Sequence, residues 1–162
     1  MIINKIERSY IKHTDKEILG FFGLYRFLSN FEKSPIYYEG ELYPSTENAY
    51  MAAKTLDLAA RKQFLNIEPH EAKKLGRQIE LRPDWNDVKE DIMSLIVFQK
   101  FNTNLDLRNQ LLATGDAYLE ETNHWGDKIW GCDENGEGMN LLGHLLMNLR
   151  TFFKNQKQGR DL

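Results

Sequence analysis

The sequence predicts a mostly helical α+β fold with small β elements, formed by one domain over residues 1–153. Three observations carry this prediction. Helical periodicity dominates the chain after residue 45, two short runs before it are rich in aromatic and β-branched residues, and no repeat or Pro/Gly/Ser-rich linker divides the 162 residues. A chain of this length buries about two-thirds of its unfolded surface, so it can build one core without staples. Residues 154–162 are too polar for that core and are predicted to be a tail.

The first predicted elements are β-strands. ILGFFG at 18–23 and PIYYEGELY at 35–43 carry the aromatic and β-branched residues typical of strands. The Glu39-Gly40 pair inside the second run predicts a tight hairpin turn.

Helices follow from Ser45. A Ser-Thr cap and an Ala-rich run predict a helix over about 47–65, and a shorter helix follows over 69–79. Pro83 breaks the chain, after which Asp84 is expected to cap the next helix. The core face of that helix is predicted from apolar residues at helical spacing, namely Val88, Ile92, Leu95, Ile96 and Phe98 to Phe101. The remaining elements are predicted as a helix over 104–113, a strand over 117–121, a loop over 125–138 and a helix over 139–153.

Composition excludes several classes of protein. A formal net charge of -3 argues against a protein that binds nucleic acid by covering phosphates with cations. The single cysteine, Cys132, excludes an intrachain disulfide and a Cys-based zinc site, which fits a reducing cytosol. The N-terminal residues lack an apolar run long enough for a signal peptide or a membrane span. We expect a cytoplasmic protein.

The residue pattern predicts neither a metal site nor another cofactor. The four histidines show no ligand spacing such as HExxH. No serine stands in a GxSxG context and Cys132 has no evident base, so nucleophilic Ser or Cys catalysis is not predicted.

Two stretches in the first third of the chain hold residues that suit a ligand. In GLYRFLSNF, Arg26 supplies a planar fork for phosphate or carboxylate, while Ser29 and Asn30 supply directional hydrogen bonds. The alternative is a loop whose polar groups satisfy its own backbone. In YPSTENAYMAAK, Glu47, Tyr50 and Lys54 share one helix face. The alternative is a first-turn acid that complements the helix dipole, with a solvated lysine two turns on.

A third stretch, GRQIELRPDW, places cations around an indole. Arg77, Arg82 and Lys89 flank Trp85, a grouping that suits a flat heterocycle with a phosphate. The alternative is a tryptophan that fills the corner between two helices.

The fourth stretch covers residues 125–143 and contains Trp125, Asp127 and five glycines. Ordering a loop with this many glycines costs much backbone entropy. This cost indicates that the loop serves a purpose, such as close approach of the backbone to a ligand. Gly138 to Asn140 then open the last helix, whose free amides are expected to bind phosphate. The stretch is neither a Walker motif nor GxGxxG.

These stretches, in this order, resemble the NADAR family, which includes the YbiA-like N-glycosidases. The resemblance covers nearly the whole chain from Phe22 to Arg150. It rests on YRFLSNF, YPSTENAYMAAK, AKKLGR with LRPDW and VK, LLATGDAYLEE, WGD, and GMNLLGHLLMNLR.

The resemblance implies a compact α+β domain of the YbiA-like type that hydrolyses an N-glycosidic bond between a ribose and a base. The implied substrates are phosphorylated intermediates of riboflavin biosynthesis, or ADP-ribosylated guanine in DNA. The family's acidic residue falls on Glu47, its aromatic residue after the Arg-Pro turn on Trp85, and its WGD motif on Trp125 and Asp127.

Breaking a ribosyl C1′–N bond builds positive charge on the sugar, which a carboxylate can offset while it orients water. We expect Glu47 in this role and Asp127 as the second carboxylate or as a ligand of the ribose hydroxyls. Lys54 has two interpretations, an electrostatic partner of Glu47 or an amine that captures ring-opened ribose as a Schiff base. Two alternatives from other classes are a non-catalytic module that binds ADP-ribose or NAD, and a protein-interaction module.

Overall fold

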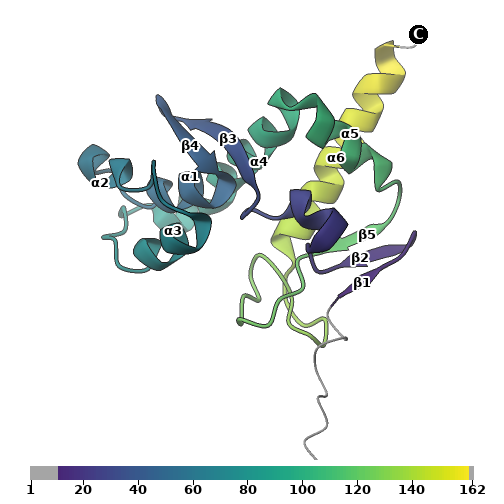
Figure 1. Cartoon of the computed structure of the whole chain (residues 1–162), viewed down its shortest axis with the longest axis horizontal. Helices are drawn as coiled ribbons and strands as arrows, with labels where there is room; N and C mark the ends of the chain where they lie inside the picture. Colours follow the sequence, from purple (N-terminus) through teal and green to yellow (C-terminus); the bar gives the residue numbers. More distant parts are fainter. Residues whose placement is uncertain (1–10, 161–162) are drawn as a thin grey trace, which may run out of the picture. The chain divides into compact units, whose positions relative to one another are not determined.

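The computed structural model describes residues 11–160, so the predictions made for residues 1–10 and 161–162 lie outside the described residues. The chain divides into two compact units. One, the two-segment unit, joins the described residues up to 29 to those from 106 onward; the other is the Asn30–Leu105 unit. That residues 1–153 form a single domain stays a prediction. The α+β class is confirmed, since long helices accompany short strands in Figure 1.

The two-segment unit is built on a three-stranded sheet. Its strands are β1 (Lys12–His13), β2 (Glu17–Leu19) and β5 (Tyr118–Glu120), in the order β1-β2-β5. β1 is antiparallel to β2, whereas β5 is parallel to β2 and places Leu119 beside Ile18. Both of these side chains are buried, so they form the centre of this small core. The strand predicted at 117–121 is thereby confirmed.

The last helix, α6 (Leu141–Arg160), packs on this sheet. Leu142, Leu146, Leu149 and Phe153 are all buried and follow one helix face. The helix continues to Arg160, so the polar residues that follow Phe153 extend it as exposed further turns. α5 (Leu105–Ala113) agrees closely with the predicted helix over 104–113.

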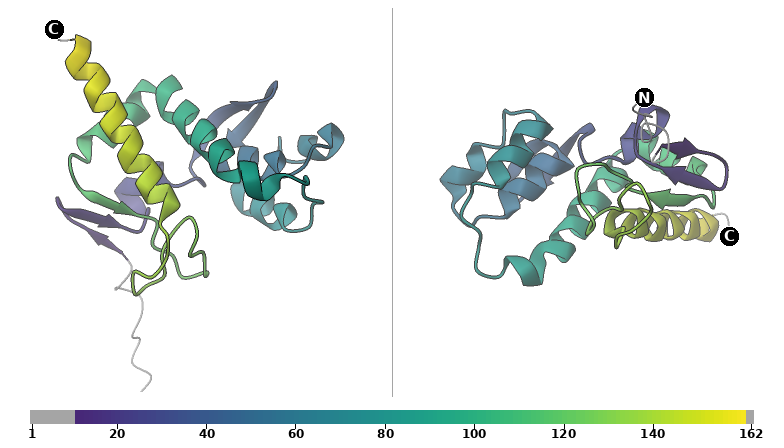
Figure 2. Two further views of the ribbon diagram at one scale, coloured as in Figure 1. Left: turned by 180° about the vertical axis from the view of Figure 1, so that it is seen from behind. Right: turned by 90° about the horizontal axis from the view of Figure 1, so that it is seen from below.

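Residues 121–140 form the long loop that precedes α6. Figure 2 shows this loop at the amino-terminal end of the helix. It is held by an isolated bridge between Thr122 and Cys132. The prediction of a loop over 125–138 is therefore confirmed.

The strand predicted over 18–23 is wrong in its second half. β2 ends at Leu19, and Gly20 has a φ of 81°, which turns the chain out of the sheet. A 3-10 helix, η1 (Gly23–Leu28), follows. Phe21 lies in the turn after β2, and it is buried there although it is not part of a strand.

The Asn30–Leu105 unit begins with the predicted hairpin, formed by β3 (Lys33–Tyr38) and β4 (Glu41–Ser45). Glu39 and Gly40 occupy the turn with φ values of 43° and 90°. Positive φ at both central positions matches the twist of a two-residue hairpin, so this prediction is confirmed.

The single helix predicted over 47–65 is wrong, because two helices replace it. α1 (Thr46–Ala53) ends at Lys54, and α2 (Leu58–Lys62) begins after Asp57. The carboxylate of Asp57 accepts hydrogen bonds from the amides of Ala59 and Ala60, which caps a new helix inside the Ala-rich run.

The next two helices are placed as predicted but differ in detail. α3 (Pro69–Gly76) ends three residues before the predicted limit of 79. α4 (Trp85–Thr103) starts after Asp84, whose carboxylate makes no cap and instead pairs with Arg82. The predicted core face is wrong at Leu95 and Phe98, which are exposed, while Ile92 and Ile96 are buried.

The helices α1, α2 and α3 lie together beside the hairpin in Figure 1. α1 contacts α2, α3, α4 and both strands of the hairpin. Every residue of α1 is buried, so its polar side chains must find partners inside the protein.

Candidate functional site

The start of α1 is fixed by a buried hydrogen-bond network. The hydroxyl of Ser45 accepts a hydrogen bond from the Asn48 amide at 3.1 Å and donates one to Asn48 Oδ1 at 2.6 Å. Asn48 Nδ2 in turn donates to the carbonyls of Phe64 and Ile67, at 2.9 and 2.8 Å. The Ser-Thr-Glu-Asn sequence therefore anchors the first turn to the segment after α2. Asn48 was missed by sequence reasoning, although an amide three residues after a serine cap is a signal for such a network.

Glu47 lies in this first turn and is 8% exposed. Its amide donates a hydrogen bond of 3.0 Å to the carbonyl of Asn30. The helix start is thus tied to the segment that carries Asn30, whose side-chain amide also contacts Met93 Sδ at 3.6 Å. A carboxylate held in a first turn receives the favourable field of the helix dipole.

Lys54 lies two turns after Glu47, where α1 ends. Its Nζ donates a long hydrogen bond of 3.4 Å to the carbonyl of Gly76. Burial lowers the pKa of Lys54 from its ordinary value of 10.5, and the nearby charge of Glu47 opposes part of that shift. Glu47 and Lys54 therefore interact electrostatically along one helix face, as the spacing predicts.

Trp85 packs against Tyr50, which lies between Glu47 and Lys54 on α1. Their ring centroids are 5.1 Å apart with the planes inclined at 51°. The turn before Trp85 is fixed to α1, because the amide of Arg82 donates to the carbonyl of Lys54 at 2.7 Å. The structure therefore brings the second and third candidate stretches together.

Arg77 follows directly after the last residue of α3 and is exposed. Its positive charge contributes to the lowered pKa of Lys54, so Arg77 lies near the end of α1. Within the Asn30–Leu105 unit, the structure thus groups five of the predicted site residues around α1, and the sixth, Asn30, is joined to them through its carbonyl.

The other predicted site residues belong to the two-segment unit. Arg26 is exposed in the last turn of η1, and Ser29 is buried at the end of that helix. Trp125 is 38% exposed and meets the ring of His124 edge to face at 5.1 Å.

Asp127 shapes the loop in which it lies. Its Oδ1 accepts hydrogen bonds from the amides of Ile129 and Trp130, at 3.0 and 2.9 Å. The side chain of Asn123 completes the turn by bonding to both backbone groups of Asp127. One carboxylate oxygen is therefore committed to loop structure.

Gly138 and Asn140 have structural tasks that the sequence did not reveal. A Cβ on Gly138 would lie 2.4 Å from the carbonyl oxygen of Gly131, so close packing alone requires glycine there. The buried Asn140 side chain bonds to the backbone of Glu121 and Leu119 and to the Tyr118 hydroxyl.

The amides at the start of the last helix, which were predicted to bind phosphate, are already occupied. The amides of residues 139, 140, 141 and 142 donate to carbonyls of the preceding loop, those of Lys128, Gly131, Ile129 and Trp130 respectively. A phosphate would have to displace these hydrogen bonds, so the prediction of a free helix start is wrong.

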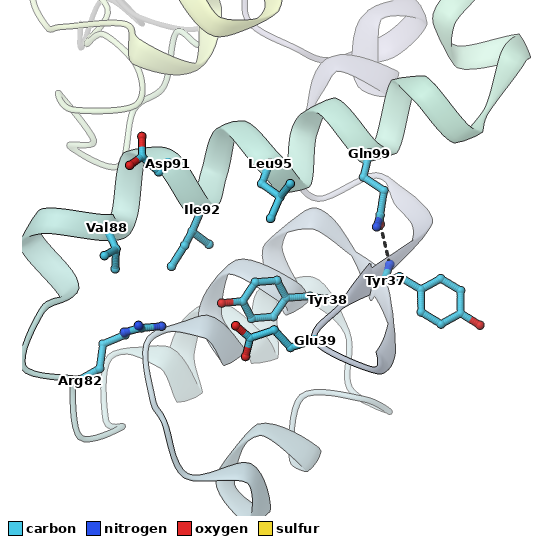
Figure 3. A pocket seen from close by; sticks show the side chains of 9 residues that line it. All are labelled: Tyr37, Tyr38, Glu39, Arg82, Val88, Asp91, Ile92, Leu95 and Gln99. Carbon is cyan, nitrogen blue, oxygen red and sulfur yellow. Dashed lines mark hydrogen bonds between the residues drawn. The ribbon is translucent and has the colours of Figure 1, made fainter.

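A pocket of about 540 Å³ opens on another face of the Asn30–Leu105 unit (Figure 3). The ring of Tyr38 faces Ile92 and Leu95, with Arg82 at one end and Gln99 at the other. Gln99 Oε1 accepts a hydrogen bond of 2.6 Å from the Tyr37 amide. The side chains grouped around α1 do not line this pocket, so it is separate from them.

Arg61, which contacts the pocket residues Tyr38 and Glu39, is a buried cation that sequence reasoning missed. It is 3% exposed, its guanidinium pairs with Glu39, and its Nε donates to the Thr55 carbonyl at 2.8 Å. The guanidinium also lies 5.3 Å from the centre of the Tyr38 ring. The hydrogen bond from Arg61 lowers the pKa of Glu39. These contacts join α2 to the hairpin.

Residues 11–160 show neither a metal-binding cluster nor a membrane-spanning helix. In this part of the chain, no group of three or more His, Cys, Asp or Glu side chains could hold a metal ion. Its helices are also too short or too polar to cross a bilayer.

The fold and the group around α1 define a class of protein. A buried carboxylate, a desolvated lysine and paired aromatic rings, all carried by one small α+β unit, suit an enzyme that acts on a flat, charged small molecule. The chain belongs to the NADAR family, because the NADAR domain model matches residues 9–154.

Several relatives agree with this membership. The chain is 38% identical to the N-glycosidase YbiA of Escherichia coli (strain K12), over 78% of this chain and 80% of that protein. It is also 38% identical to an N-glycosidase of Nostoc punctiforme, over 81% of this chain and 87% of that protein. A riboflavin biosynthesis protein of Vibrio vulnificus is 39% identical over 76% of this chain, which spans only 34% of that longer protein.

The fold is likewise similar to a solved structure. The NMR structure of E. coli YbiA superposes with a TM-score of 0.78 and 34% sequence identity, and the match covers 93% of this chain and 92% of that one. The predicted resemblance to the NADAR family is thereby confirmed.

Proposed function

We propose that this protein is an N-glycosidase that hydrolyses the bond between ribose C1′ and a base nitrogen. The single observation that carries the proposal is the group on α1, where the buried Glu47 shares a helix face with the half-buried Lys54 and with Tyr50, itself packed on Trp85. The names of the relatives, N-glycosidase YbiA among them, support the same reaction.

In this reaction, the C1′–N bond breaks and its electron pair leaves with the base, which takes up a proton. Water then adds its oxygen to C1′ and loses a proton. The positive charge that develops on the ribose is offset by the carboxylate of Glu47, which also orients the water. That Asp127 provides the second carboxylate or binds the ribose hydroxyls stays a prediction.

Binding of the substrate is assigned to aromatic and cationic residues. Trp85 stacks on the base, and Tyr50 supports Trp85 from α1. A stacking role of Trp125 stays a prediction. Arg77 binds phosphate as a planar fork, and Asn30 supplies hydrogen bonds. The same roles for Arg26 and Ser29 stay predictions. Gly138 and Asn140 keep the loop in shape, because their packing and hydrogen bonds are used inside the protein.

Lys54 has two possible roles in this proposal. As an ammonium it balances the charge of Glu47, and as a neutral amine it attacks C1′ of the ring-opened sugar and forms a Schiff base with loss of water. The second role needs a desolvated lysine, and burial, which lowers the pKa of Lys54, supplies that desolvation. Borohydride added during turnover would trap a Schiff base as a covalent adduct on Lys54, and no adduct is expected if the role is electrostatic.

The substrate is one of two ribosylated compounds. The first is a phosphorylated intermediate of riboflavin biosynthesis, the pathway in which the Vibrio relative is named. The second is ADP-ribosylated guanine in DNA. The net charge of -3 favours the small substrate, because a broad basic face for nucleic acid is not needed. A cytoplasmic location belongs to this proposal, since either substrate is an intracellular compound.

One experiment tests the proposal. The protein is incubated separately with a ribosylaminopyrimidine phosphate and with an oligonucleotide that carries ADP-ribosylated guanine, and the released base or ADP-ribose is measured by mass spectrometry. Release from one of them is expected and names the substrate. Thermal stabilisation by ADP-ribose without release from either would overturn the proposal in favour of a binding module.

A further inference from the structure

One face of α4 lies against a pocket, where the sequence predicts part of the core. The α4 residues that line this pocket of about 540 Å³ recur at helical spacing, so they follow one side of the helix (Figure 3). They are Val88, Asp91, Ile92, Leu95 and Gln99. Leu95 is 59% exposed and lies at this pocket. Part of the apolar stripe of α4 therefore faces a cavity that is open to solvent.

The hairpin provides the other wall of the pocket. Tyr38 is the last residue of β3, and Figure 3 shows its ring facing Ile92 and Leu95. An aromatic ring thus faces branched aliphatic side chains, and such walls suit the flat apolar body of a ligand. The volume also lies within the range of small-molecule sites, about 300–1,000 Å³.

Arg82, the cation among the lining residues, is already paired. Its guanidinium donates two hydrogen bonds to the carboxylate of Asp84, from Nε at 2.6 Å and from Nη2 at 3.0 Å. A guanidinium held in this bidentate way has little capacity left for an anionic ligand. The pocket is therefore poorly suited to a phosphate or a carboxylate.

The carboxylates of the pocket favour a cation. Glu39 lines the pocket and pairs with the buried Arg61. Asp91 also lines the pocket and lies exposed on α4, so its charge can reach a ligand. With their partners included, three carboxylates meet two guanidinium groups, which leaves one negative charge. A tyrosine ring face likewise attracts a cation. The charges are complementary to a ligand with one positive charge.

We propose that this pocket binds a flat aromatic amine in its protonated form. The aromatic body lies between the ring of Tyr38 and the side chains of Ile92 and Leu95, and the ammonium group pairs with Asp91. The pocket is lined by residues outside the group on α1, so this second small-molecule site does not depend on the proposed function.

Calorimetry with tryptamine, tryptophol and indole-3-acetate tests the charge of the ligand. These probes share an indole ring and a short side chain, which ends in an ammonium, a hydroxyl or a carboxylate. Tryptamine should bind about twofold to fivefold more tightly than tryptophol, the gain that a solvent-exposed ion pair provides, and indole-3-acetate should bind most weakly. Equal affinities for the three probes would overturn the proposal.

The variants Asp91→Asn and Glu90→Gln test where the ammonium group binds. Asparagine keeps the size of Asp91 and removes its charge, so Asp91→Asn should bind tryptamine about twofold to fivefold more weakly and tryptophol as the wild type does. Glu90 is the matched control, because it is the exposed acid that precedes Asp91 on α4 and it does not line the pocket. Glu90→Gln should bind both probes like the wild type. Equal effects of the two substitutions on tryptamine would contradict the assignment.

The apolar wall is tested with Leu95→Ala, for which Leu58→Ala is the control. Both leucines are exposed, so both variants should fold, and Leu58 lies on α2 outside the pocket. Leu95→Ala should weaken binding of tryptamine and tryptophol alike, by about fivefold or more, because alanine removes apolar surface that faces Tyr38. Leu58→Ala should bind both probes like the wild type. Unchanged affinities in Leu95→Ala would exclude the pocket. A dimer in sedimentation equilibrium that Leu95→Ala dissociates would mean that a second copy of the chain fills it, which would also overturn the proposal.

Discussion

Lys54 and Gly76 join α1 to α3 through a hydrogen bond from Nζ of the lysine to the carbonyl oxygen of the glycine, 3.4 Å long. The same glycine has no room for a side chain, because a Cβ would lie 2.2 Å from Sδ and 3.2 Å from Cβ of Met51. The close approach of the two helices and the placement of the lysine therefore depend on one residue.

Replacing Gly76 with alanine should destabilise the protein. We expect the free energy of unfolding to fall by about 1–3 kcal/mol, the usual cost of overpacking, as measured by urea denaturation. The matched control is Gly159→Ala near the end of α6, where a Cβ meets no atom within 4 Å and alanine should be neutral or slightly stabilising.

The double variant Gly76→Ala with Met51→Ala separates overpacking from other effects. Shortening Met51 removes the atoms that the new methyl group meets, so the two substitutions together should cost less than the sum of their separate costs. Strict additivity would contradict the overpacking explanation.

The lowered pKa of Lys54 predicts how stability changes with pH. Between the folded pKa and the ordinary value of 10.5, the unfolded chain binds a proton that the folded protein has lost. The contribution of Lys54 to the free energy of unfolding therefore rises with pH in this window. Below the folded pKa, where the lysine is protonated in both states, Lys54 destabilises the folded protein by its full amount. Urea denaturation from pH 7 to 10.5 should show wild-type stability increasing relative to that of Lys54→Met. If the free energies of unfolding of the two proteins differed by a constant amount across this range, burial would not be lowering the pKa of Lys54.

Sequence reasoning predicted the fold class, the hairpin at Glu39-Gly40 and the family, because each depends on local patterns or on several motifs in order. It missed the break after Lys54, since the Ala-rich run favours a continuous helix while Asp57 caps a new one only through its side chain. Likewise, Arg61 and Asn48 read as surface residues by type. Their burial depends on contacts with segments distant in sequence, Glu39 for the first and Ile67 for the second.

The sequence predicted one part of the candidate site and missed another. The helical spacing of Glu47, Tyr50 and Lys54 correctly placed them on one face, since spacing determines that face directly. The occupied amides at the start of α6 could not be predicted, because their carbonyl partners come from an irregular loop with no periodic pattern.

Replacing Glu47 with glutamine tests the proposed carboxylate. Glutamine keeps the size and the hydrogen bonding of the side chain but removes the charge that offsets the ribosyl cation. We expect kcat to fall by about 10²–10⁴-fold with little change in KM, measured by release of base from the substrate identified above. Glu41→Gln on β4 is the control and should keep wild-type activity. A folded Glu47→Gln variant with unchanged kcat would remove Glu47 from the reaction.

Substitutions of Trp85 test stacking on the base. Trp85→Ala should weaken substrate binding about tenfold or more, because stacking of a base on an aromatic ring contributes roughly 1–3 kcal/mol. Trp85 also packs on Tyr50 and is 7% exposed, so the alanine variant loses core contacts as well. Trp85→Phe keeps an aromatic ring against Tyr50 and should lose only a small part of the affinity. Unchanged calorimetric affinity in a folded alanine variant would exclude Trp85 from the site.

Cys132 provides a test of the two-segment unit that is independent of activity. Cys132 is 2% exposed, and burial raises the pKa of its thiol from an ordinary 9.0 to about 11. The thiolate is the reactive form, so the folded protein should react with a thiol-directed disulfide reagent at pH 8 at least about a hundredfold more slowly than protein unfolded in guanidinium, as two pKa units imply. Cys132→Ser, which lacks the thiol, gives the background.

Rapid labelling of the folded protein would mean that the bridge between Thr122 and Cys132 opens readily, and the loop over residues 121–140 would then be less stable than its hydrogen bonds indicate. Slow labelling whose rate increases as the pH approaches 11 is the expected result, because it follows from a buried thiol in a closed loop.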